Sequence, residues 1–192
     1  MQNAAYNFPI TSAGPASREF LRRNISDFQS ALQFIGNLPY GRNKSRSNFI
    51  ALFEENCGTC STKHALLKQL AQENNADSVT LIIGLVKMNA ANTPAVAATL
   101  SRAKLEYMPE AHCYLRINGA ITDVMKASST PDDFINDILE ETSVQPEQVA
   151  DYKVEYHRSF LERWLRENPE ISYSLEELWS IREQCIKDLH DG

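Results

Sequence analysis

The chain has 192 residues, a length typical of one domain with a terminal extension. Hydrophobic residues make up 43% of the total, which is enough for a core, and the net charge of −6 argues against a nucleic-acid-binding surface. The longest apolar run, residues 79–88, has about half of the roughly 20 residues needed to cross a bilayer, and residues 1–15 do not resemble a secretory signal. We therefore expect a cytoplasmic protein that binds neither nucleic acid nor membrane, with its cysteines reduced.

The N-terminal part of the chain predicts helices before the first strand. Residues 1–15, rich in Asn, Ser, Ala and Pro, indicate a loose arm. Across residues 17–35 apolar side chains recur three and four positions apart, which predicts one amphipathic helix. The apolar segment 49–53 is either a buried strand or a helical turn. A further helix is expected over residues 61–73, with Thr59 as its N-cap.

The middle of the chain predicts strands. Residues 78–87 are rich in Val, Leu and Ile, which indicates a strand covered on both faces. Pro94 is suited to open a short helix. Apolar alternation in residues 112–117 and 120–125 flanks Asn118-Gly119, and this pattern predicts a β-hairpin.

The last third of the chain predicts helices. Pro131 and the acidic residues after it suit the first turn of a helix. Residues 147–167 predict another helix, and a capping box at 174–177 opens the last one. The charged composition indicates that residues 146–192 form a helical extension of a core that spans 16–145.

Cys60 directly follows the predicted cap Thr59, at the start of a helix. The unpaired N–H groups and partial positive charge at a helix N-terminus favour the thiolate, which is the nucleophilic form of cysteine. Gly58 allows another group to approach the backbone, and Lys63 adds a positive charge one turn later. Because most free cysteines are simply buried, the prediction of Cys60 as a nucleophile depends on a partner base.

The hairpin supplies a candidate base and a carboxylate to orient it. A two-residue turn pairs Ile117 with Ala120, and side chains alternate between the two faces of each strand. His112 and Asp123 then lie on one face, as diagonal neighbours roughly 7 Å apart at Cβ. We predict His112 as the general base and Asp123 as its orienter.

The remaining histidines and cysteines are expected to have structural roles. His64 competes as the base because it lies on the same helix as the predicted nucleophile, but no orienter is evident for it. We interpret His64 as a packing or rim residue, and His157 and His190 as solvated. Cys113 is expected on the strand face opposite to the predicted base, and Cys185 in the core.

Two segments resemble the transglutaminase-like branch of the papain-like cysteine hydrolases. Residues 58–67 (GTCSTKHALL) are similar to the nucleophile segment of that family, and residues 111–124 (AHCYLRINGAITDV) to its His…Asp segment. The resemblance covers roughly residues 36–127. It implies an α+β fold in which an antiparallel sheet packs on the cysteine-bearing helix, with N- and C-terminal helices added. The implied catalytic triad is Cys60, His112 and Asp123.

The resemblance implies acyl chemistry through a thioester. The expected function is that of a cysteine hydrolase or acyltransferase, of peptidase or amidase type, acting on a peptide, an amide or a small acyl substrate without a cofactor or metal. Tyr40, Arg42 and Lys63 are the candidate substrate-binding residues, and the two cations indicate an anionic or carboxylate-bearing group. Tyr40 and Asn43 are candidates for a second oxyanion donor besides the backbone N–H of the nucleophile.

Three alternatives remain open. The sequence CGTC at 57–60 is a C-x-x-C, typical of a thioredoxin-like thiol–disulfide oxidoreductase, in which Cys57 attacks beside a cis Pro109. A metal site formed by Cys57, Cys60, His64 and either His112 or Cys113 lacks the second ligand pair of structural zinc sites. A non-catalytic interaction domain is the third alternative.

Overall fold

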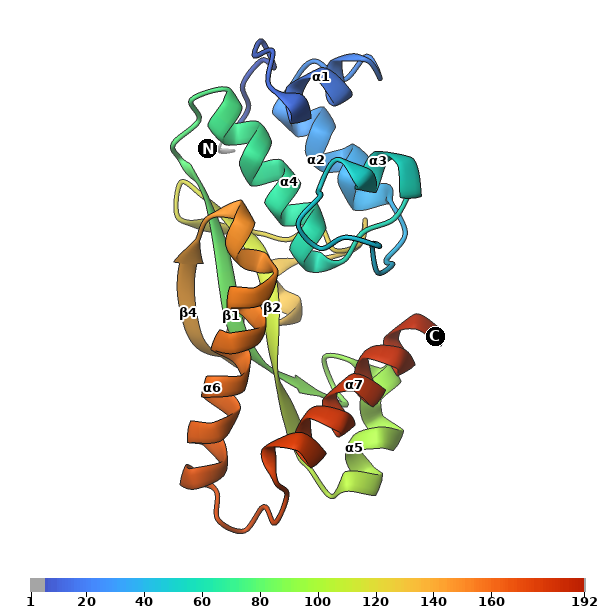
Figure 1. Cartoon of the computed structure of the whole chain (residues 1–192), viewed down its shortest axis with the longest axis vertical. Coiled ribbons are helices and arrows are strands. Elements are labelled where there is room, and N and C mark those ends of the chain that lie inside the picture. Colours follow the sequence, from blue (N-terminus) through green and yellow to red (C-terminus); the bar gives the residue numbers. More distant parts are fainter. Residues whose placement is uncertain (1–5, 192) are drawn as a thin grey trace. The chain divides into compact units, whose positions relative to one another are not determined.

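The computed structural model describes residues 6–191 and is of mixed α+β class. A four-stranded antiparallel sheet has the order β3-β2-β1-β4 (Figure 1). Its strands are β1 (Val79–Asn89), β2 (Tyr107–Ile117), β3 (Ala120–Thr122) and β4 (Ile138–Val144). The α-helices are α1 (Pro15–Leu21), α2 (Phe28–Asn37), α3 (Ala51–Glu55), α4 (Cys60–Glu73), α5 (Ala97–Ala103), α6 (Asp151–Glu167) and α7 (Leu175–Asp191). The 3-10 turns are η1 (Pro94–Val96), η2 (Pro131–Asp133), η3 (Ile135–Asp137) and η4 (Pro146–Val149).

The chain divides into two compact units. The first unit contains the described residues up to 83 together with 113–131 and 142–150, and the second contains 84–112, 132–141 and the residues from 151 onward. The helices α6 and α7, which we expected in a C-terminal extension, thus belong to the second unit with segments from the middle of the chain. Within residues 6–191, no helix is both long enough and apolar enough to span a lipid bilayer.

The single helix expected over residues 17–35 is wrong, because the chain breaks between α1 and α2. Asn24 adopts a left-handed backbone conformation with φ of 59°, which a helix does not continue through. Asp27 then caps α2 by accepting a hydrogen bond from the Ser30 N–H at 3.0 Å. Both residues are polar types that favour helix ends over helix interiors.

The described part of the expected N-terminal arm, residues 6–15, is packed inside the first unit. Residues 1–5 lie outside the described chain. The Phe8 ring stacks on Phe28 with a centroid distance of 4.6 Å, and Ile10 is buried. These contacts join the segment to α2.

The predicted hairpin is confirmed in its turn and register, but its second strand, expected over residues 120–125, ends at Thr122. Ile117 pairs with Ala120 across the β2–β3 ladder. Asn118 and Gly119 both have positive φ values, 49° and 84°, as a type I′ turn requires. The predicted strand at β1 and the helical turn that opens at Pro94 are also confirmed.

The helix expected from Pro131 is wrong beyond its first turn. Only the short turns η2 and η3 form, and β4 follows at Ile138. Along β4, half-buried and exposed side chains alternate, which is the period of a strand at the edge of a sheet. The opening Pro and acidic residues also suit a 3-10 turn, so they indicated the start of a helical turn but not its length.

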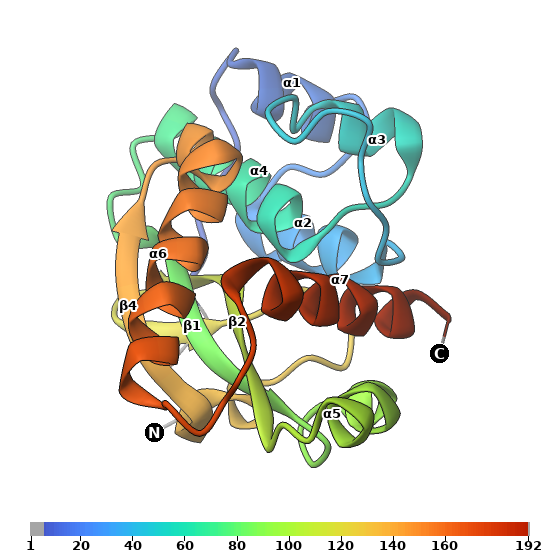
Figure 2. The same ribbon diagram turned by 60° about the horizontal axis from the view of Figure 1, so that its bottom comes forward.

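The second unit has its own core. Helix α7 packs against η1, α5 and α6 (Figure 2), and its predicted capping box is present, with the Ser174 N–H donating to Glu177 Oε2 at 2.8 Å. Cys185 is buried as expected, and burial raises the pKa of its thiol to about 11. The expectation that His157 is solvated is wrong: its ring is 2% exposed, and Nε2 lies 2.8 Å from the Pro109 carbonyl oxygen. The His190 side chain lies outside the described part of the structure.

Candidate active site at the start of helix α4

Helix α4 begins at the predicted nucleophile. The Thr59 hydroxyl accepts from the Thr62 N–H at 3.3 Å, and the Thr62 hydroxyl accepts from the Thr59 N–H at 2.9 Å. This reciprocal cap confirms Thr59 as the N-cap and makes Cys60 the first residue of the helix. Cys60 is half-buried and lies at the end of α4 where the backbone N–H groups have no partner within the helix.

The loop before Cys60 pairs with an earlier segment. Tyr40 and Gly58 form an isolated parallel bridge, in which the Gly41 N–H donates to the Gly58 carbonyl and the Gly58 N–H donates to the Pro39 carbonyl, both at 3.2 Å. A Cβ atom on Gly58 would lie 2.6 Å from a Leu52 methyl carbon. The expected close approach at Gly58 is therefore confirmed. The segment that carries Tyr40 lies beside residues 57–60, which we call the cysteine loop.

Asn43 holds this loop together. Its amide nitrogen donates to Glu55 Oε2 at 2.8 Å and to the Cys57 carbonyl at 2.9 Å, while its amide oxygen accepts from the Thr62 hydroxyl at 2.7 Å. Because an amide nitrogen has two N–H groups, both are used inside the protein. Asn43 therefore has a structural role here and not that of the second oxyanion donor.

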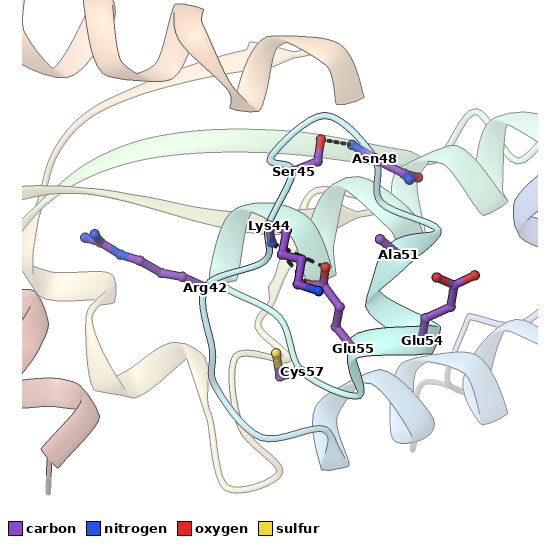
Figure 3. Close-up of a pocket in the computed structure, with 8 residues that line it drawn as sticks. All are labelled: Arg42, Lys44, Ser45, Asn48, Ala51, Glu54, Glu55 and Cys57. Carbon is purple, nitrogen blue, oxygen red and sulfur yellow. Dashed lines mark hydrogen bonds between the residues drawn. The ribbon is translucent and has the colours of Figure 1, made fainter.

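A pocket of about 660 Å³ lies between this loop and α3 (Figure 3). Its lining residues are Arg42, Lys44, Ser45, Asn48, Ala51, Glu54, Glu55 and Cys57. Arg42, a predicted substrate-binding residue, is exposed and extends away from Glu54 in Figure 3. The backbone N–H of Lys44 donates to Glu55 at 3.3 Å. The pocket thus contains a free thiol with two cations and two carboxylates around it.

His64 is a buried link between α4 and the segment after β3. Its Nδ1 lies 2.7 Å from the Cys60 carbonyl oxygen, and its Nε2 accepts from the Val124 N–H at 2.9 Å. Asp123 Oδ1 lies 3.2 Å from the same Nε2. The expectation of a packing role agrees with the complete burial of His64, and the sequence did not show that the Asp123 carboxylate lies beside its ring.

Asp123 directly follows β3 in the chain and lies beside His64 of α4 in space. Its side chain is 4% exposed, and Oδ1 accepts from the Met125 N–H at 2.9 Å. Strand β3 ends at Thr122, so Asp123 is not part of the ladder. The structure therefore brings the segment of the predicted orienter against the first turn of the helix that carries Cys60.

Lys63 lies in the interior and not on the substrate-facing surface where we expected it. Its side chain has no exposed area, and Nζ donates to the Leu38 carbonyl at 2.5 Å and to the Met125 carbonyl at 2.7 Å. Burial lowers the pKa of Lys63 to about 8, and the nearby Asp123 and Cys60 act against this lowering. Lys63 is therefore a buried cation of the site rather than a surface residue that contacts substrate.

The predicted base His112 is a half-buried residue of β2. It belongs to the second unit, where its ring meets the Phe134 ring edge-on at 5.1 Å. The next residue, Cys113, belongs to the first unit and is buried, with its sulfur 3.5 Å from the Ser61 hydroxyl. The burial pattern agrees with the expected alternation of these two side chains.

Three observations bear on the oxidoreductase and metal-site alternatives. None of the four cysteines forms a disulfide bond. The peptide bond before Pro109 is trans, unlike the cis bond that the oxidoreductase alternative needs. Within the described residues, no group of three or more His, Cys, Asp or Glu side chains is placed to hold a metal ion.

Comparison with models of known protein families, with curated proteins and with solved structures gave no match to this chain. The function is therefore argued from the residues of the site and their geometry.

Proposed function

We propose that this protein is a cysteine hydrolase or acyltransferase of transglutaminase-like type, with Cys60 as its nucleophile. The proposal depends on the geometry at the start of α4. The half-buried Cys60 occupies the first position of this helix, and the segment that contains Asp123 is hydrogen-bonded to Lys63 and His64 of the same helix. A helix start favours the thiolate over the thiol, and a bonded carboxylate nearby is the part of a triad that orients the base. The proposed fold of the core is the transglutaminase-like one.

The proposed reaction proceeds through a thioester. The base takes the proton of Cys60, and the sulfur attacks the acyl carbon, which forms a C–S bond and places negative charge on the carbonyl oxygen. Backbone N–H groups at the start of α4 are suited to stabilise that oxygen. The base returns the proton to the leaving group, and water or an amine then cleaves the thioester.

The base in this proposal is His112, assigned from the sequence, with Asp123 as its orienter. Both nitrogens of His64 already have partners inside the first unit, and its ring has no exposed area. These contacts support a role for His64 in holding the helix start rather than in proton transfer. Asp123 Oδ1 accepts from the Met125 N–H and lies 3.2 Å from His64 Nε2, so the carboxylate has a fixed position; its role as the orienter of His112 is assigned from the sequence.

The proposed substrates are peptides, amides or small acyl compounds in the cytoplasm. Arg42 lines the pocket that Cys57 also lines, which supports binding of a carboxylate or another anionic group in that pocket. Tyr40 lies in the segment paired with that loop and is the second proposed substrate contact.

The test is hydrolysis of a set of p-nitrophenyl acyl esters and peptide anilides that differ in acyl charge and length. We expect turnover by the wild-type protein, loss of turnover in Cys60→Ala, and a large decrease in His112→Gln. Cys57→Ser is the matched control, because it removes the other half-buried thiol of the same loop and is expected to retain turnover. Turnover that survives Cys60→Ala but disappears in Cys57→Ser would contradict the proposal.

A further inference from the structure

Lys63 connects three segments of the first unit that carry predicted site residues. Its ammonium donates to the Leu38 carbonyl, just before Tyr40, and to the Met125 carbonyl, just after Asp123. Its own backbone is in the first turn of α4, three residues after Cys60.

We propose that Lys63 is a positioning residue for the nucleophile, whose buried ammonium holds these segments together and stabilises negative charge on the Cys60 sulfur. The inference rests on the proposed function and deepens it, since it assigns the cation that supports the thiolate. It also replaces the substrate-binding role expected for Lys63.

The aliphatic part of the Lys63 side chain packs against Gly58 of the cysteine loop. A Cβ atom on Gly58 would lie 3.0 Å from Lys63 Cγ, and Gly58 stands between the two thiols of the loop. The side chain has no exposed area, so solvent does not screen its charge as it screens the charge of a surface lysine. Electrostatic interactions are stronger in the protein interior than in water, so a buried ammonium in the first turn of α4 is expected to favour negative charge on the Cys60 sulfur.

The charged groups around Lys63 also support an interaction between its ammonium and the Cys60 thiolate. Two neutral carbonyls do not replace the solvation that a buried ammonium loses, and burial accordingly lowers the pKa of Lys63 to about 8. Three groups oppose this effect: Asp123, then Cys60, then Cys57. Since coupling between two sites is reciprocal, a thiolate that stabilises the ammonium is stabilised by the ammonium to the same extent.

Lys68 provides a matched control on the same helix. Its Nζ also donates to a backbone carbonyl, that of Val79 at 2.7 Å, and burial also lowers its pKa. Its nearby opposite charge, however, is Asp77 and not a thiol. Removal of Lys68 therefore perturbs α4 in a similar way without removing a charge that acts on Cys60.

The first experiment measures the rate of alkylation by iodoacetamide between pH 5 and pH 9 in a Cys57→Ser background, with the modified thiol identified by peptide mass spectrometry. We expect Lys63→Met to slow the modification of Cys60 about tenfold at pH 7, as loss of a nearby opposite charge predicts. Lys63→Arg keeps the charge and is expected to retain most of the rate, and Lys68→Met to match the parent. A Lys63→Met profile that coincides with the parent profile would overturn the inference.

A second experiment avoids any change at Lys63. In protein labelled with ¹³C at lysine Cε, the titration of Lys63 is followed by NMR in the wild type and in Cys60→Ala. Loss of the thiolate is expected to move this titration to lower pH, and an unchanged titration would overturn the inference. If Cys60 in the parent protein is alkylated no faster than the buried Cys113, the proposed function fails; a reactive Cys60 that is indifferent to Lys63→Met overturns the Lys63 assignment alone.

Discussion

Lys63 should impose a pH dependence on the stability of the first unit. Its pKa is lowered from the ordinary value of 10.5 to about 8 because the side chain is buried. In the pH range between these two values the unfolded chain binds more protons than the folded protein, so stability increases with pH. At roughly 1.4 kcal/mol per pH unit of pKa difference, the buried ammonium destabilises the folded state by about 3 kcal/mol below pH 8. This cost disappears as the pH rises through 10.5.

The assay is urea unfolding of the wild type and Lys63→Met at half-unit steps from pH 7 to pH 10.5, followed by far-ultraviolet circular dichroism. The free-energy difference between the two proteins should change by about 3 kcal/mol over this range, in favour of the wild type at high pH. Groups that do not interact with Lys63 titrate equally in both proteins and cancel in the difference. Lys126→Met removes an exposed ammonium and serves as the control, with a constant difference expected. A constant difference for Lys63→Met would refute the reasoning.

Four further substitutions test the packing, the charges and a helix cap. Gly58→Ala should destabilise the folded protein by about 1–3 kcal/mol because the new methyl group would lie 2.6 Å from a leucine carbon. Gly36→Ala should stabilise it by about 0.5–1 kcal/mol, because Gly36 is in a helix and the nearest atom to the new methyl group lies at 3.8 Å. Thermal unfolding of the two variants checks that the two effects have opposite signs. Glu110→Ala should cost about 3 kcal/mol, since it leaves the buried guanidinium of Arg182 without its two-point partner, and a urea midpoint equal to that of the wild type would contradict this. Asp27→Ala should cost about 1 kcal/mol through loss of the α2 cap, and restoration by Asp27→Ser would identify the cap as the cause.

Features that depend on a few neighbouring residues could be predicted from the sequence. The Thr59 cap and the Asn118-Gly119 turn are local, and both are present as predicted. The break at Asn24 was missed because an apolar spacing of three and four residues continues through it, although the polar residues at the break favour turns. The helix expected after Pro131 failed because pairing of β4 at the edge of the sheet outweighed local helical signals.

In the candidate site, too, features set by neighbouring residues could be predicted, and features set by distant residues could not. The position of Cys60 follows from its neighbours alone, and the sequence located it correctly. The burial of Lys63 and His64 depends on carbonyls and a carboxylate that lie more than 20 residues away along the chain, at Leu38 and in the Asp123 segment. The one available signal was that a Lys-His pair occupies the first turn of a helix whose later positions are apolar.

The central claim is that Cys60 carries an acyl group during turnover. The most direct measurement is rapid quenching of the protein with p-nitrophenyl acetate, followed by intact mass and peptide mapping. The account predicts one acetyl group on Cys60, labile to hydroxylamine and absent from Cys60→Ala. An acetyl group found on another residue, with Cys60 unmodified, would contradict it.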